Sequence, residues 1–332
     1  MERAAHGGDL AGARQQFPSA PEPWIDLSTG INPLPYPLPP LPPEVWQRLP
    51  GRVETDRLAA TTARAYGADQ ARMVVAAPGT QALIGLLPRL RAQSRVAILG
   101  PTYAEHEICW RREGHHVVVV PHVEAMAGAG VVVIVNPNNP TGRLVDRAKL
   151  RQLAADLDRR GGLLVIDEAF VDPLGPAASL VPELPRATIV LRSFGKTFGL
   201  AGLRLGFAVA DISLAGRINA LLGPWAVSGP AIAIAERALA DAAWLLDTRR
   251  RVADDAARLD ELLRRAGCEV IGGTPLFRLA AHRSAQRLFE TLGSFGIHVR
   301  RFAENRSWLR FGLPGSETSW VRLAQALTAA TT

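Results

Sequence analysis

The hydrophobic positions between residues 53 and 230 fall into short continuous runs that alternate with longer segments of helical period. A continuous apolar run predicts a strand that is buried on both faces, and such strands occur mainly in parallel sheets. Helices between the strands are typical of an α/β architecture. We expect strands at 96–99, 116–120, 131–135, 163–166 and 188–191, and helices at 53–66, 79–91 and 103–113.

The pattern changes after residue 230. One long helical segment is expected at 231–266, and a further helix begins at about residue 317. Between them the sequence predicts short strands near 268–271, 276–280, 298–301 and 308–312. This mixture indicates a second, smaller α/β domain.

Residues 33–43 hold seven prolines in eleven positions, so this stretch is extended and forms neither a helix nor a central strand. We interpret it as a connector between an N-terminal arm and the main body. The expected division is an arm with a substrate loop at 1–45, a large domain at 46–225 and a small C-terminal domain at 226–332.

The 332 residues carry 38 Lys and Arg against 31 Asp and Glu, which gives a net charge of +7. Only Lys149 and Lys196 are lysines, so 38 minus 2, or 36, of the basic residues are arginines. This bias has three interpretations: a solvated basic surface, a preference for anionic small molecules, or nucleic-acid binding. The scattered arginines and the lack of a zinc-finger or RNA-binding signature disfavour the last.

Cys109 and Cys268 are far apart and form no CxxC pair, so we expect neither a disulfide framework nor a metal site. The first ten residues include acidic side chains and no apolar segment, which disfavours a signal peptide. The longest purely apolar run, 131–135, is far shorter than the roughly 20 residues of a membrane span. We therefore expect a cytoplasmic protein.

Two turn-rich segments lie where open α/β sheets place their ligands. Gly79 precedes Thr80 and Gln81 at a helix start, where free N–H groups suit a phosphate. An ordinary N-cap by Thr80 is the alternative. Residues 136–142 read Asn-Pro-Asn-Asn-Pro-Thr-Gly, which is either a plain turn or a place where an Asn amide binds a ligand oxygen.

A carboxylate and a lysine follow the next two expected strands. Asp167 ends a buried run, where a carboxylate is costly unless it has a partner such as a protonated heterocyclic nitrogen. A helix cap or a salt bridge is the alternative. Lys196 stands in an otherwise arginine-using chain, and a desolvated lysine forms an imine whereas arginine cannot. Ser193 and Arg204 flank it as possible phosphate partners, and an incidental lysine is the alternative.

Together these segments supply, in chain order, a phosphate cradle, a donor to a ring oxygen, a carboxylate for a ring nitrogen and an imine-forming lysine. Pyridoxal phosphate (PLP) has these binding requirements. Over residues 6–310 the chain resembles the fold type I PLP enzymes of the class I/II aminotransferase superfamily. The resemblance implies an α/β fold, with a mostly parallel sheet flanked by helices in the large domain and a smaller α/β domain.

The resemblance also implies roles for single residues. Lys196 and Asp167 are the expected catalytic residues, because Lys196 forms the Schiff base and Asp167 pairs with the pyridinium nitrogen. Asn139 is expected to bind the ring hydroxyl oxygen and Tyr103 to stack on the ring. The full set expected to bind the cofactor is Gly79, Thr80, Gln81, Tyr103, Asn139, Asp167, Ser193, Lys196 and Arg204.

Within the superfamily the chain is similar to the L-threonine-O-3-phosphate decarboxylases of cobalamin biosynthesis. The similarity lies in residues 6–9, His-Gly-Gly-Asp, and 27–33, Leu-Ser-Thr-Gly-Ile-Asn-Pro. It implies decarboxylation of O-phospho-L-threonine to (R)-1-amino-2-propanol O-2-phosphate, with Arg310 on the α-carboxylate and Arg300 on a second anion. The full set expected to bind the substrate is His6, Gly7, Gly8, Asn32, Arg300 and Arg310. A flexible terminus is the alternative for residues 6–8.

Two departures bear on the reaction. Phe170 stands where aminotransferases usually carry Tyr, which disfavours transamination. Near 49–50 the chain lacks the Tyr-Pro that in many relatives reaches the partner subunit's cofactor phosphate. We expect a homodimer that acts on a small phosphorylated amino acid and binds no nucleic acid, membrane or metal. The alternatives are a histidinol-phosphate or related small-substrate aminotransferase, and a PLP-fold regulator or DNA-binding protein.

Overall fold

The computed structural model describes residues 7–331, which form two compact units. The large unit comprises residues 35–139 and 143–247, and the small unit comprises 7–34, Pro140–Gly142 and 248–331. These bounds differ from the expected division at 45 and 225, because residues 7–34 fold with the C-terminal part of the chain. No helix of residues 7–331 has both the length and the apolar composition needed to cross a membrane.

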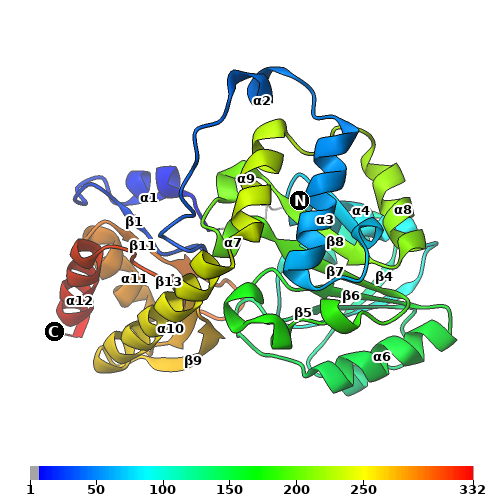
Figure 1. The fold of residues 1–332 in the computed structure, drawn as a ribbon. Helices are drawn as coiled ribbons and strands as arrows, with labels where there is room; N and C mark the ends of the chain where they lie inside the picture. The colour runs from blue at the N-terminus through cyan, green and yellow to red at the C-terminus, as the bar shows by residue number, and fades with distance from the viewer. Residues whose placement is uncertain (1–6, 332) are drawn as a thin grey trace. The chain divides into compact units, whose positions relative to one another are not determined.

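The large unit contains a seven-stranded sheet in the order β2-β8-β7-β6-β5-β3-β4 (Figure 1). From β4 to β7 along this order all neighbours pair in parallel, whereas β8 is antiparallel to both β7 and β2. The expected mostly parallel sheet is confirmed, although β2 and β8 were not anticipated. The strands are β2 Val74–Ala77, β3 Arg95–Leu99, β4 His116–Val120, β5 Val131–Val135, β6 Leu163–Asp167, β7 Thr188–Ser193 and β8 Gly206–Ala210.

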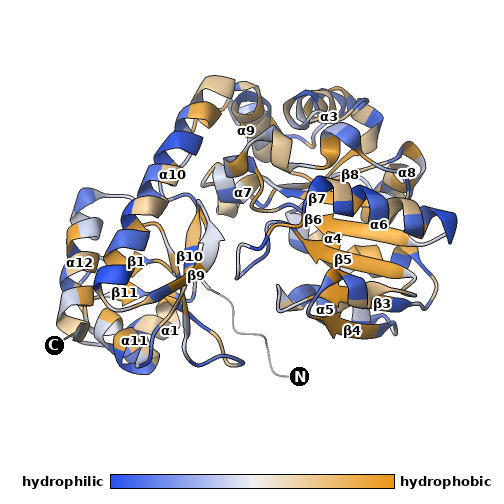
Figure 2. Ribbon diagram, turned by 90° about the horizontal axis from the view of Figure 1, so that it is seen from below, coloured by the Kyte–Doolittle hydropathy of each residue, from blue (hydrophilic) through white to orange (hydrophobic). Residues whose placement is uncertain are grey.

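Helices cover both faces of this sheet. The helices of the large unit are α2 Pro43–Gln47, α3 Arg52–Tyr66, α4 Thr80–Leu86, α5 Ala104–Arg112, α6 Arg147–Arg159, α7 Phe194–Thr197, α8 Ile212–Leu222 and α9 Gly229–Ala240. In β5, Val131 and Val133 pack in one core cluster with α4, α5 and α8, whereas Val132 and Ile134 pack in another with α3, α6 and α9. Figure 2 shows β5 and β6 largely in the hydrophobic colour, as strands buried on both faces require.

The single long helix expected at 231–266 is wrong, because the segment forms two helices, α9 and α10 Ala242–Arg265. Asp241 separates them with a ψ of 77°, outside the helical region. Its carboxylate accepts a hydrogen bond from the Trp244 N–H at 3.0 Å. An aspartate in this place caps the following helix, which an apolar period alone does not reveal.

The small unit contains a four-stranded antiparallel sheet, β12-β13-β10-β9, and a parallel pair, β1-β11. The pair joins the N-terminal segment to the C-terminal one, and the Phe17 and Phe289 rings pack with centroids 5.8 Å apart. The one strand expected at 298–301 is two, which belong to different sheets. The elements are α1 Leu10–Gln16, β1 Ile25–Asp26, β9 Glu269–Thr274, β10 Phe277–Ala281, α11 Ala285–Ser294, β11 Ile297–His298, β12 Arg300–Arg301, β13 Trp308–Gly312 and α12 Glu317–Thr331.

Candidate active site

The residues expected to bind a cofactor all lie in the large unit, around the carboxyl ends of its central strands. Asp167 is the last residue of β6 and Ser193 is the last residue of β7. These strands are parallel neighbours, so their carboxyl ends meet at one edge of the sheet. Lys196 follows directly in α7. In open α/β sheets this edge is where ligands bind.

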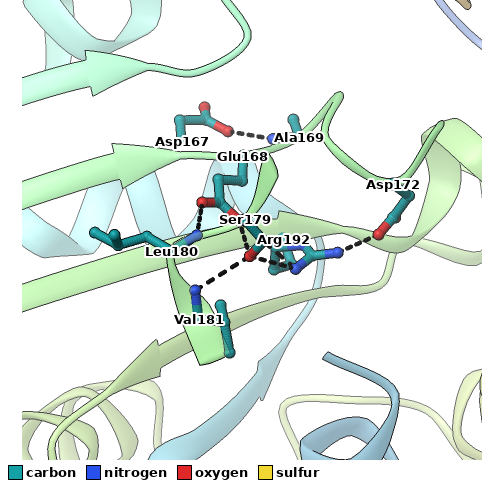
Figure 3. Close-up of polar contacts among 8 residues, drawn as sticks. All are labelled: Asp167, Glu168, Ala169, Asp172, Ser179, Leu180, Val181 and Arg192. Atoms are coloured by element: carbon teal, nitrogen blue, oxygen red, sulfur yellow. Dashed lines mark hydrogen bonds and ion pairs between the residues drawn. The ribbon is translucent and has the colours of Figure 1, made fainter. Parts of the chain in front are cut away.

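The carboxyl group of Asp167 is buried and receives hydrogen bonds on both oxygens. The Nε2 atom of His106 lies 3.0 Å from Oδ2, and the Ala169 N–H donates to Oδ1 at 3.0 Å (Figure 3 draws the second bond). The alternative interpretation, in which Asp167 has a partner within the protein, therefore holds in part, and that partner is a histidine.

His106 was not anticipated from the sequence, although it lies within the helix expected at 103–113, which is α5. Its Nδ1 is buried and has no hydrogen-bond partner among residues 7–331. If Nδ1 carried a proton, a buried donor would be left unpaired, which is costly. We infer that the Nε2 atom of His106 carries the proton directed at Asp167. His106 thus orients the carboxyl group of Asp167.

Gly79 and Arg204 approach each other closely at the start of α4. Gly79 caps this helix with a φ of 82°, and a Cβ on it would lie 2.8 Å from Nη2 of Arg204. A Cβ on Gly206, which pairs with Ser193 between β7 and β8, would lie 2.6 Å from the Thr80 nitrogen. Only glycine permits such contacts. A guanidinium and a helix-start N–H are thereby brought together, as an anion site requires.

The alternative interpretation of Thr80 as an ordinary N-cap is wrong. The cap residue is Gly79, which has no side chain that could accept a hydrogen bond from the first turn of α4. The first-turn N–H groups therefore have no side-chain cap of the kind that most helix starts carry. This arrangement favours the phosphate interpretation of the segment.

Tyr103 and Gln81 form a short chain of hydrogen bonds beside the Asp167–His106 pair. The Tyr103 hydroxyl donates to Oε1 of Gln81 at 3.1 Å, and Nε2 of Gln81 donates to Glu105 at 2.8 Å. The rings of Tyr103 and His106 meet edge to face with centroids 6.3 Å apart. Gln81 thus fixes the Tyr103 hydroxyl, while the stacking of Tyr103 on a cofactor ring stays a prediction.

The asparagines of the 136–142 segment have different surroundings. Asn136 exchanges two hydrogen bonds with the Val145 backbone, at 2.7 and 3.1 Å. Asn138 accepts from the Thr102 hydroxyl at 2.6 Å and donates to a backbone carbonyl at 3.0 Å. Both asparagines therefore hold the turn in shape. Asn139 is half-buried at the end of the large unit's part of this segment, and its contact with a ring oxygen stays a prediction.

Lys196 lies against an aromatic ring. Its Nζ atom is 5.5 Å from the centroid of the Phe170 ring, which is itself buried. A phenyl ring attracts an ammonium group through its face but donates no hydrogen bond. The position that would carry a tyrosine hydroxyl in an aminotransferase therefore offers only an apolar surface here.

The residues expected to bind the substrate, as far as the structure describes them, lie in the small unit. Arg300 and Arg310 are directly opposite each other in the β12–β13 ladder. Arg310 is buried, and its Nη2 donates to the Ser28 carbonyl at 2.6 Å. Burial and the charge of Arg300 lower the pKa of Arg310 to about 10. Opposed like charges are unfavourable, so an anion bound between these arginines would be stabilising.

Ser28, whose role was not anticipated, connects the segment of Gly7 and Gly8 to Arg310. Its hydroxyl accepts from the Gly8 N–H at 2.7 Å and donates to Asp26 at 2.6 Å, while its carbonyl accepts from Arg310. A Cβ on Gly7 would lie 2.3 Å from the Ser28 carbonyl oxygen, so a glycine is required there. The interpretation of residues 6–8 as a flexible terminus is therefore not supported at 7 and 8. His6 lies outside the described residues.

Asn32 is buried with a fixed orientation. Its Oδ1 accepts from the Leu34 N–H at 3.1 Å and from Nη2 of Arg251 at 3.0 Å. The carboxamide atom that accepts both hydrogen bonds must be the oxygen, because the NH2 group only donates. Nδ2 therefore points away from Leu34 and Arg251. The role of Asn32 toward a substrate phosphate stays a prediction.

Comparison with known proteins supports the resemblance to the class I/II aminotransferase superfamily. A family model described as aminotransferase class I and II matches residues 45–327. The chain is 43% identical over 326 residues to the threonine-phosphate decarboxylase of Pseudomonas aeruginosa, covering 97% of this chain and 96% of that protein. It is 44% identical over 335 residues to a threonine-phosphate decarboxylase of a Sinorhizobium species, covering 97% of each.

Solved structures share the fold. The histidinol-phosphate aminotransferase of Sinorhizobium meliloti, solved in complex with pyridoxal-5'-phosphate, matches with a TM-score of 0.80 and 20% identity. The match covers 100% of this chain and 95% of that one. At this identity the likeness shows the architecture alone.

Proposed function

The chain belongs to the class I and II aminotransferase family, and from this premise we propose that it is a PLP-dependent decarboxylase of O-phospho-L-threonine. The product is (R)-1-amino-2-propanol O-2-phosphate, a component of cobalamin biosynthesis. The relatives with 43% and 44% identity over 97% of the chain are threonine-phosphate decarboxylases, which supports this choice. The structural observation that carries it is the opposed pair Arg300–Arg310, because the substrate has both a carboxylate and a phosphate.

The residues at the carboxyl ends of the central strands of the large unit fit PLP. Lys196 would hold it covalently through Nζ, and the Asp167–His106 pair would hold the proton on its ring nitrogen. When bound, PLP supplies an electron sink for the electron pair that a broken bond leaves on Cα. The residues that would bind its phosphate are Gly79, Thr80, Ser193 and Arg204, with Gln81, Tyr103 and Asn139 around the ring.

Substrate orientation decides which bond breaks. Arg310 binds the α-carboxylate, and Arg300 with Gly7, Gly8 and Asn32 binds the phosphate, joined by His6. Holding both anions would orient the substrate so that the bond from Cα to the carboxylate is the one that breaks. Loss of CO2 would leave both bonding electrons on Cα. The amine of Lys196, once the substrate amine has displaced it, would donate the proton that replaces the carboxylate.

One experiment separates this function from transamination. A single turnover with O-phospho-L-threonine and no keto acid should release CO2 and phosphorylated aminopropanol, which gas analysis and mass spectrometry measure. Phe170 offers no hydroxyl at the position that aminotransferases use, which favours this outcome. Stoichiometric pyridoxamine phosphate without CO2 would instead establish a histidinol-phosphate-type aminotransferase. Borohydride reduction before peptide mapping should label Lys196, and a label on Lys149 contradicts the site.

We also propose that a second copy of the chain covers an apolar groove of about 720 Å³ on the large unit. Trp46, Leu49 and Trp225 line it and are 67%, 65% and 60% exposed, more than large apolar side chains usually are. Light scattering should give the mass of a dimer for the native protein and of a monomer for Trp46→Glu. An unchanged dimer in that variant contradicts this surface.

We place the protein in the cytoplasm. Cys109 and Cys268 are both free and buried thiols, which agrees with a reducing compartment. Fractionation of cells that express the chain with its natural termini should recover it with cytoplasmic markers, and recovery with secreted proteins would contradict this placement.

A further inference from the structure

A cluster of buried charges lies beside the candidate active site and takes no part in the chemistry proposed above. Arg192 of β7, Glu168 after β6 and Asp172 have side chains that are at most 5% exposed (Figure 3). Arg192 forms an ion pair with Asp172 through Nη2, and its Nη1 lies 3.6 Å from Oε2 of Glu168. The guanidinium also packs 3.9 Å from the centre of the Tyr66 ring.

Ser179 connects the members of this cluster. Its hydroxyl oxygen accepts from Nη1 of Arg192 at 3.1 Å and from the Val181 N–H at 3.1 Å. Both acceptor sites of the oxygen are then used, so its single hydrogen is donated to Oε2 of Glu168, 2.6 Å away. The other Glu168 oxygen accepts from the Leu180 N–H at 2.8 Å. Figure 3 shows the bonds from Arg192, Val181 and Glu168 meeting at Ser179, and the Leu180 bond at Glu168.

Both oxygens of Glu168 therefore accept a hydrogen bond within the core. Burial raises the pKa of its carboxyl, and the charge of Arg192 opposes that shift. Two ion pairs and the hydrogen bonds of Ser179 and Leu180 hold three ionisable side chains out of water in this place. A well-packed apolar cluster of the same volume is often at least as stable as such an arrangement. Stability alone thus does not account for these side chains.

The position of the cluster supplies a second reason. Glu168 follows Asp167 directly, and Arg192 precedes Ser193 directly. Successive residues of a strand point to opposite faces, and the Glu168 N–H still bonds the Leu191 carbonyl at 2.9 Å, so the pattern continues to the strand ends. Asp167 and Ser193 therefore share the face of α4 and α5, while the charged cluster lies on the face of α3, α6 and α9.

We propose that Arg192, Glu168 and Ser179 are positioning residues, which tie the ends of β6 and β7 together from the face opposite to the cofactor. These contacts set the spacing between Asp167 and the Ser193–Lys196 segment. They thereby set the orientation of the cofactor ring between Asp167 and Lys196. The inference rests on the proposed function, because it assumes that Asp167 and Lys196 hold PLP.

The test uses two variants that keep the charges. Arg192→Lys retains the positive charge but loses the planar fork that reaches both Asp172 and Ser179. Ser179→Ala removes the connecting hydroxyl and no charge, and it serves if Arg192→Lys does not fold. Two controls match them. Leu157→Ala removes packing from α6 on the same face of the sheet, and Tyr66→Phe keeps the ring under Arg192 while removing the hydroxyl.

Three measurements on each holoenzyme distinguish positioning from stability. They are the thermal unfolding midpoint, the induced circular dichroism of the bound PLP band, and kcat and KM for O-phospho-L-threonine. Arg192→Lys and Ser179→Ala should change the induced circular dichroism and lower kcat by about ten- to a hundredfold with KM nearly unchanged. Leu157→Ala should lower the unfolding midpoint by a similar amount and leave the other two readouts as in the native protein. Tyr66→Phe should leave all three unchanged.

Native circular dichroism and kcat in both charge-keeping variants would overturn the inference. An equal loss of the cofactor signal in Leu157→Ala would also overturn it, because the signal would then follow stability. If the native protein itself shows no PLP band after incubation with the cofactor, the proposed function fails and the inference fails with it. A native band with unaltered variants refutes the positioning role alone.

Discussion

Replacing Gly79 by alanine tests whether the close approach of Gly79 and Arg204 is a cofactor cradle. Gly79 has φ 82° and ψ 159°, a conformation that only glycine adopts readily. The new methyl group would also lie 2.8 Å from Nη2 of Arg204, which forces that guanidinium to move. The substitution therefore acts at the helix start and on Arg204 together.

The expected size of the effect follows from this backbone strain. Holding a non-glycine residue in such a conformation costs about 1–3 kcal/mol. If the loop keeps its shape, the free energy of unfolding falls by about that amount. If the loop relaxes instead, the same free energy is lost from cofactor binding, and the Kd for PLP rises about 5- to 150-fold.

Fluorescence titration of the apoprotein with PLP measures the Kd, and urea unfolding measures the stability. Gly202→Ala is the matched control, because Gly202 lies two residues before Arg204 and a Cβ on it meets nothing within 4 Å. Its Kd and stability should match those of the native protein within about 0.5 kcal/mol. A native Kd and native stability in Gly79→Ala would refute the cradle.

Three further predictions follow from the remaining contacts. Arg310→Lys keeps a cation but loses the fork, so KM for the substrate should rise about tenfold or more while the PLP Kd stays native; loss of the cofactor would contradict the assignment. His106→Phe should lower kcat by about tenfold through a misoriented Asp167, and Asp167→Ala should lower it much further, so equal losses would contradict an orienting role. Burial lowers the pKa of His298 below its usual 6.5, so below that pH the unfolded chain binds a proton that the folded chain does not. Stability should therefore fall as the pH drops through about 6.5, and His298→Gln should flatten that fall in urea unfolding at each pH, whereas an unchanged slope would exclude His298 as its source.

The elements of the large unit could be predicted from the sequence because their signals are local. The helix expected at 53–66 is α3 Arg52–Tyr66, which ends at Gly67 with a φ of 78°, as a glycine after a helical period predicts. The apolar run at 131–135 is β5, buried along its whole length. β2 and β8 were not expected, and the pairing of β8 with β2 joins two segments that are distant in sequence, which no local pattern indicates.

Some residues of the candidate site could likewise be recognised from the sequence, and others could not. Lys196, Asp167 and Gly79 could be found from the sequence because their residue types stand out against an apolar strand end or an arginine-rich chain. His106 could not, because a histidine inside a helix carries no sign of the carboxylate that it meets 61 positions later. Only the order of the strands and the pitch of α5 bring those two side chains to 3.0 Å.

By itself, the sequence determined the α/β class, the position of most strands and the chain order of the residue types that we propose bind the cofactor. These features depend on the period of hydrophobic positions and on single residues with rare chemistry, both of which are properties of short segments. The tertiary structure alone decided the register that sets Arg300 opposite Arg310 and the network that keeps Arg192, Glu168 and Asp172 buried. Such pairs depend on which strands become neighbours, and that is settled by packing over the whole unit, because a shift of register by one residue would turn each side chain to the other face.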